Sequence, residues 1–110
     1  NDIIRLKIRL KGSSMEIEEA LALLKYLVSH NRFHLVNRRD KMAQPVSREL
    51  AKSIVQQLTS SDFYKHEQNR NNPLQYVWIF ITDDGKRYYI KFVFVKNNSG
   101  VVFISFHISY

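Results

Sequence analysis

The chain has 110 residues, 17 of them basic and 10 acidic, so its formal net charge is +7 and its pI is about 9.8. This length fits a single domain over residues 1–110, and the apolar and aromatic content argues against disorder. The lack of cysteine excludes disulfides and thiolate metal sites, and no apolar run reaches the ~18 residues of a membrane span. We therefore expect a soluble, cytoplasmic domain with no membrane partner. Its charge attracts a polyanion, which is nucleic acid, anionic lipid or an acidic protein.

Apolar and basic residues alternate from Ile4 to Lys11, near the start of the sequence. A period of two predicts a half-buried strand, so we expect residues 1–12 to add an edge strand to a core formed by residues 13–110. Its cations either discourage aggregation at the sheet edge or contact phosphates, and we favour the first role.

Two amphipathic helices are predicted in the first half of the chain. Ser13 and Glu16 have the spacing of a capping box, and apolar residues at helical intervals continue to about Ser29, where Asn31 is a plausible stop. A short strand is expected at 32–36, followed by a basic loop at 37–43. The second helix follows Pro45 and Ser47, and its expected inner face consists of Leu50, Ala51, Ile54, Val55 and Leu58.

The segment after the second helix carries little periodicity. We expect a short turn at 62–65 and a mobile surface loop at 66–75, which is rich in asparagine. The run 76–82 is continuously apolar and predicts a buried central strand. A three-residue loop at 83–85 would then pair Ile79 with Tyr89.

The 22 residues from Lys86 to His107 predict two further antiparallel strands. A three-residue loop at 97–99 would set Tyr89 opposite His107. The expected core rows are Tyr88, Ile90, Phe92 and Phe94 on the first strand and Val102, Ile104 and Phe106 on the second. The opposite row of the second strand contains Phe103, and the polar side chains expected on the outer face are Arg87, Tyr89, Lys91, Ser105 and His107. The predicted fold is α+β, an antiparallel β-meander with two helices packed on its aromatic face.

This combination of side chains suits RNA cleavage. An imidazole that titrates near neutrality transfers protons, and cations beside it stabilise charge on a phosphate. The 2′-OH of RNA then attacks the adjacent phosphate, a reaction that DNA lacks the hydroxyl to perform. The four histidines have no metal-ligand spacing and no phosphate-binding glycine motif is present, so no metal or cofactor is predicted.

Four short motifs occur in a recognisable order: Ser61 to Lys65 (SDFYK), Trp78, Tyr89 to Phe92 (YIKF) and Ile104 to His107 (ISFH). With them the chain resembles the MqsR family of mRNA interferase toxins over about residues 16–110. The resemblance implies a RelE-like fold, cleavage of mRNA without metal, and a cognate antitoxin protein as partner. It matches Lys65 and Tyr89 to the family's active-site lysine and tyrosine. Ile79 stands where the family has glutamine, and His107 where it has lysine.

Residues and resemblance together predict an endoribonuclease toxin that acts on mRNA, free or on the ribosome. The expected catalytic residues are Lys65, Tyr89 and His107, and the expected RNA-binding residues are Lys91, Arg87, Arg38, Arg39 and Ser105. Two alternatives remain open. One is a non-catalytic nucleic-acid-binding module on the same fold, and the other is a basic protein-interaction or inhibitor domain that meets an acidic partner.

Overall fold

The computed structural model describes residues 15–36 and 44–109. The strand expected at 4–10, the capping residue Ser13 and the loop residues Arg38 and Arg39 lie outside this range. The elements in chain order are α2 (Ile17–Ser29), β1 (Phe33–Leu35), β2 (Gln44–Pro45), α3 (Arg48–Gln57), the 3-10 turn η2 (Ser60–Asp62), β3 (Phe63–Asn69), β4 (Asn72–Asp84), β5 (Lys86–Val95) and β6 (Gly100–Ile108).

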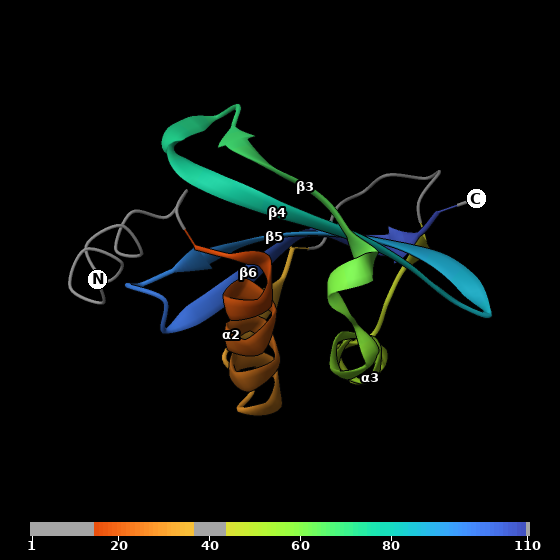
Figure 1. Cartoon of the computed structure of the whole chain (residues 1–110). Coiled ribbons are helices and arrows are strands. Elements are labelled where there is room, and N and C mark those ends of the chain that lie inside the picture. Colours follow the sequence, from red (N-terminus) through yellow and green to blue (C-terminus); the bar gives the residue numbers. More distant parts are fainter. Residues whose placement is uncertain (1–14, 37–43, 110) are drawn as a thin grey trace.

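The strands form one twisted sheet in the order β1-β6-β5-β4-β3. β3 to β6 are antiparallel neighbours, β1 runs parallel to β6, and β2 pairs with the C-terminal end of β6. Helices α2 and α3 both lie on one side of the sheet (Figure 1). The predicted α+β fold, with a meander covered on one face by two helices, is therefore confirmed for the described residues.

Helix α2 starts later than predicted, at Ile17, and ends at Ser29 as predicted. Its N-cap is Glu16, which makes no side-chain capping bond, so the expected box with Glu16 at the third helical position is wrong. At the other end Asn31 adopts a φ of +60°. The amides of Asn31 and Arg32 donate to the carbonyl oxygens of Val28 and Leu27, the Schellman arrangement in which a left-handed residue ends a helix.

Helix α3 is capped as predicted. The Ser47 hydroxyl accepts a hydrogen bond from the Leu50 amide at 3.1 Å, which satisfies one of the free donors of the first turn. Four of the five expected inner residues are buried, but Leu50 is 38% exposed. Leu50 lies about 100° around the helix from Ala51, at the margin of the buried stripe, and so it misses the core.

The predicted turn at 62–65 and mobile loop at 66–75 are wrong, because this stretch forms strand β3 and the start of β4. β3 is an edge strand with mostly exposed side chains, so it lacks the apolar alternation that reveals a half-buried strand. Its hairpin is closed by two asparagines: the side chain of Asn69 accepts from the Asn71 amide and that of Asn72 from the Leu74 amide. His66 stacks on Trp78 across the two strands, with ring centroids 3.7 Å apart.

The register between β4 and β5 differs from the prediction by two residues. Ile79 lies opposite Lys91 and Ile81 opposite Tyr89, because pairing continues to Asp84 and Lys86 and the turn closes on Gly85. Gly85 has a φ of +73°, as the hairpin requires. A shift of two residues preserves the faces, so the aromatic face of the meander is kept. It contains Trp78, Phe80, Ile90 and Phe92, all buried.

Between β5 and β6 two departures from the prediction cancel. The loop has four residues, 96–99, instead of three, and β6 contains a bulge at Ile104. The extra loop residue alone would set Tyr89 opposite Phe106, and the bulge restores the pair Tyr89–His107. The bulge also exchanges the two faces of the sheet for the residues of β6 that precede Ile104. Phe103 is therefore buried in the core and does not lie on the outer face.

The core lies between the sheet and the two helices. Its largest fully buried side chains on the sheet are Phe80, Phe92 and Phe103, and the helices contribute Leu24, Leu27 and Ile54. Arg48 of α3 fixes β1 to this layer. Its guanidinium lies 3.8 Å from the centre of the Phe33 ring and donates a hydrogen bond to the Phe33 carbonyl oxygen at 3.1 Å.

Candidate active site

The sheet surface opposite the helices, here called the outer face, collects the predicted site residues of the described chain. Two neighbouring rows cross the sheet there, since residues paired between strands point to the same side. One row contains Lys65, Ile79, Lys91 and Ser105, and the next contains Ile81, Tyr89 and His107. Arg87 follows near the start of β5, opposite Asp83. The predicted residues Arg38 and Arg39 lie outside the described ranges.

Tyr89 and His107 form the centre of this arrangement. Their rings are stacked, with centroids 5.4 Å apart and planes inclined by 18°. The Nδ1 atom of His107 lies 3.2 Å from the Ile108 carbonyl oxygen. A carbonyl oxygen only accepts, so Nδ1 is the donor in this contact and Nε2 takes no part in it.

The Tyr89 phenol is held in its neutral form. Partial burial raises its pKa above the ordinary value of 10.0, and the charge of Glu67 and the phenol of Tyr64 raise it further. At physiological pH Tyr89 is therefore a hydrogen-bond donor rather than a phenolate.

Lys65 reaches the outer face from strand β3 and not from the turn expected at 62–65. Pairing between β3 and β4 is irregular at Tyr64, the residue between Phe63 and Lys65. The Nζ atom of Lys65 lies 5.3 Å from the centre of the Tyr64 ring. Both side chains are exposed beside the Tyr89–His107 row.

Two side chains near the site were missed from the sequence. Glu67 lies two residues beyond Lys65 on β3, and both it and Tyr64 act on the pKa of Tyr89. Glu67 could have been found from its spacing of two residues from Lys65, because residues two apart on a strand point to the same face. The expectation of a loop from residue 66 onward concealed it.

Ile79 occupies the middle of the cationic row, between Lys65 and Lys91, and is only 3% exposed. It offers no hydrogen-bonding group to the site. Polar chemistry on this row is therefore left to the two lysines and Ser105.

Two negative findings apply to residues 15–36 and 44–109. No three histidine, cysteine, aspartate or glutamate side chains in these segments are grouped as a metal ion requires. Of the helices within them, none has the length and hydropathy to cross a membrane.

The fold and the outer face together define a small α+β protein with a cationic, histidine-bearing sheet surface. The family model described as "Motility quorum-sensing regulator, toxin of MqsA" matches residues 18–108. The chain belongs to this MqsR toxin family, and it is accordingly a toxin of a toxin–antitoxin pair whose partner is a cognate antitoxin. A search of curated proteins and a search of solved structures found no match to it.

Proposed function

We propose that this toxin is an endoribonuclease that cleaves single-stranded mRNA by attack of a 2′-OH on the adjacent phosphate. The observation that carries the proposal is the stacked pair Tyr89–His107 beside Lys91 in a member of a toxin family. We include in the proposal a RelE-like fold for the single domain and action in the cytoplasm, where mRNA is found.

The reaction needs one group to accept the 2′-OH proton and another to protonate the leaving oxygen. We assign the second role to Nε2 of protonated His107, and the proton of the 2′-OH passes to solvent water. The 2′-oxygen forms a bond to phosphorus while the bond from phosphorus to the 5′-oxygen breaks. The products are a 2′,3′-cyclic phosphate and a 5′-hydroxyl end, and no metal or cofactor takes part in this scheme.

The remaining side chains stabilise charge on the phosphate. Lys65 and Lys91, in the row next to Tyr89, neutralise the charge that develops on the non-bridging oxygens. The neutral Tyr89 phenol donates a hydrogen bond to one of these oxygens, and Ser105 and Arg87 contact the RNA backbone on either side. Arg38 and Arg39 are further proposed backbone contacts.

One observation favours a second function, RNA binding without cleavage. The buried Ile79 supplies no hydrogen bond at the centre of the cationic row. Under this alternative Lys65 and Lys91 hold RNA, and the side chains around them do not cleave it.

Incubation of the purified protein with end-labelled RNA, with and without EDTA, separates the two functions. We expect cyclic-phosphate and 5′-hydroxyl products in both conditions, no cleavage of a 2′-O-methyl analogue, and loss of cleavage in Tyr89→Ala, Lys65→Ala and His107→Ala. Expression in a bacterium should slow growth for the wild type and not for these variants. A wild-type protein that binds RNA, leaves it intact and does not slow growth would refute the endonuclease proposal.

A further inference from the structure

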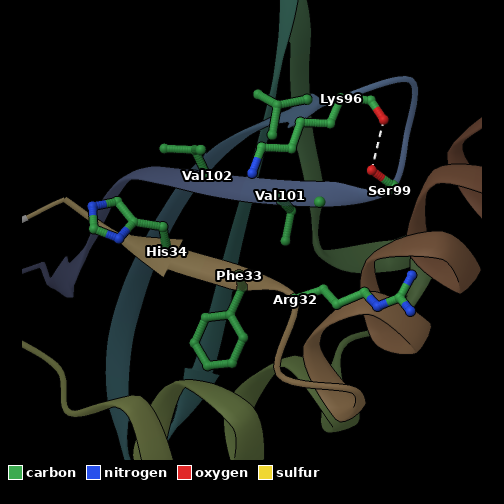
Figure 2. Close-up of a pocket in the computed structure, with 9 residues that line it drawn as sticks. Arg32, Phe33, His34, Lys96, Ser99, Val101 and Val102 are labelled. Carbon is green, nitrogen blue, oxygen red and sulfur yellow. Dashed lines mark hydrogen bonds between the residues drawn. The ribbon is translucent and has the colours of Figure 1, made fainter.

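A pocket of about 450 Å³ lies at the β1 edge of the sheet, away from Tyr89 and His107. It is formed by β1, β6 and the turn between β5 and β6 (Figure 2). None of the residues that line it belongs to the candidate active site. Its volume is in the range of pockets that hold a small ligand or one unit of a polymer, about 300–1,000 Å³.

The pocket continues the outer face beyond the catalytic rows. Val102 pairs with Val93, which lies two residues, about 7 Å, along β5 from Lys91. His34 pairs with Val102 from the neighbouring strand β1. Figure 2 shows His34, Val102 and Lys96 on one side of the sheet, and the Phe33 ring on the other. A strand of RNA bound at Lys91 therefore reaches the pocket with the nucleotide next in line.

The charge of the pocket is complementary to RNA. Three basic or titratable side chains, Arg32, His34 and Lys96, line it, and no carboxylate does. Figure 2 shows the Lys96 side chain extending over β6 toward Val102, whereas Arg32 points toward α2. Lys96 is thus the cation that faces a ligand in the pocket.

The conformation of the turn fixes where Lys96 points. Lys96, Asn97 and Asn98 all have positive φ values, between 55° and 65°, a conformation that asparagine tolerates and that is costly for lysine. The turn is closed by the Ser99 hydroxyl, which donates to the Lys96 carbonyl oxygen at 2.6 Å, and by the Ser99 amide, which donates to that of Val95 at 3.2 Å. The strained backbone holds the start of the Lys96 side chain at the mouth of the pocket.

An apolar surface and an exposed ring complete a site for a base. Val95 and Val102 supply half-buried apolar surface, and the His34 imidazole is exposed on the outer face beside Val102. Unstacked RNA bases are bound by stacking on such rings and on apolar side chains, with a cation on the phosphate.

We propose that this pocket binds one nucleotide of single-stranded RNA that flanks the cleaved bond. The base packs on Val102 against His34, and Lys96 contacts the phosphate. This inference rests on the proposed function, because it takes the RNA strand at Lys91 as its starting point.

The test measures binding of fluorescein-labelled 2′-O-methyl RNA, which is not cleaved, by fluorescence anisotropy. An eight-nucleotide probe is shortened one nucleotide at a time from each end. For the wild type we expect a step of about tenfold in Kd when the nucleotide in the pocket is removed. His34→Ala and Lys96→Asn should bind the full-length probe about tenfold more weakly and lose the step. Asparagine tolerates the positive φ at position 96, and an unchanged Tm for each variant shows that the fold is intact.

Lys25→Gln is the matched control, since it removes a positive charge from α2 on the covered side of the sheet, and its Kd and step should equal those of the wild type. The proposal is overturned if His34→Ala and Lys96→Asn keep both the Kd and the step. It is also overturned if they bind RNA normally and lose affinity for the cognate antitoxin instead, because the pocket would then be a protein-docking site. A wild type that shows the step without cleaving ribo-oligonucleotides supports the pocket and refutes the endonuclease. Cleavage of ribo-oligonucleotides by a wild type that shows no step supports the endonuclease and refutes the pocket.

Discussion

The rings of Tyr89 and His107 stack face to face on adjacent strands, with centroids 5.4 Å apart. The hydrogen bond from Nδ1 to the Ile108 carbonyl oxygen orients the imidazole, and the stack orients the phenol. Each ring thus limits the rotation of the other, so that the phenol hydroxyl and Nε2 are presented side by side on the outer face. Such pre-organisation is what a site for phosphate chemistry requires.

The Tyr89 hydroxyl and the Tyr89 ring are expected to have separable roles. Tyr89→Phe keeps the stack and removes the proposed donor to the phosphate, so kcat for RNA cleavage should fall about a hundredfold with an unchanged Tm. Tyr89→Ala should also misplace His107 and lose all measurable cleavage. The measurement is the rate of appearance of cyclic-phosphate ends. Full activity in Tyr89→Phe would show that only the ring matters.

Glu67 is expected to shift the titration of Tyr89. Removing its carboxylate in Glu67→Gln should lower the pKa of Tyr89 toward the ordinary value, although burial, the larger cause, keeps it raised. The folded state binds this proton more tightly than the unfolded chain. The resulting stability is therefore present below pH 10 and declines as pH rises through the pKa of the folded protein. Spectrophotometric titration of tyrosinate, with Tyr89→Phe as the reference, measures the shift. Asp83→Asn on the same face should leave it unchanged.

Lys65 and Lys91 are expected to contact phosphates. For single-stranded RNA, each lost contact should reduce the slope of log K against log salt concentration by about 0.7. Lys65→Met and Lys91→Met should each show this reduction, and Lys25→Met on the helical side should not. The slope is obtained from anisotropy titrations of 2′-O-methyl RNA between low and physiological salt. An unchanged slope would argue against direct phosphate contact by that lysine.

His66 should make the stability of the fold depend on pH. Burial lowers its pKa from the ordinary value of 6.5, and its Nε2 atom is enclosed without a hydrogen-bond partner. Below pH 6.5 the unfolded chain therefore binds more protons at this position than the folded protein does. The free energy of unfolding should accordingly decrease as the pH is lowered. His66→Phe keeps the stack on Trp78 and should flatten this dependence in urea unfolding measured at several pH values. A parallel decline in both proteins would assign the effect to other groups.

Much of the sheet could be predicted because its signals are local. The alternation in β5, the continuous apolar run of β4 and the positive φ at Gly85 each depend on neighbouring residues. The strand β3 could not be predicted in this way. An edge strand exposes most of its side chains, so its sequence resembles that of a loop, and Glu67 was overlooked with it.

The Tyr89–His107 pair shows most clearly which features followed from the sequence and which required the tertiary structure. The alternation of side chains in β5 is set by the pleat of a single strand, and the sequence by itself determined that Tyr89 and Lys91 share a face. The four-residue loop and the bulge at Ile104 were decided only in the tertiary structure. The bulge lets Phe103 pack beneath the helices, while Ser105 and His107 turn outward on the same strand. No single-strand pattern contains that choice, because it depends on which side chains the helices bury.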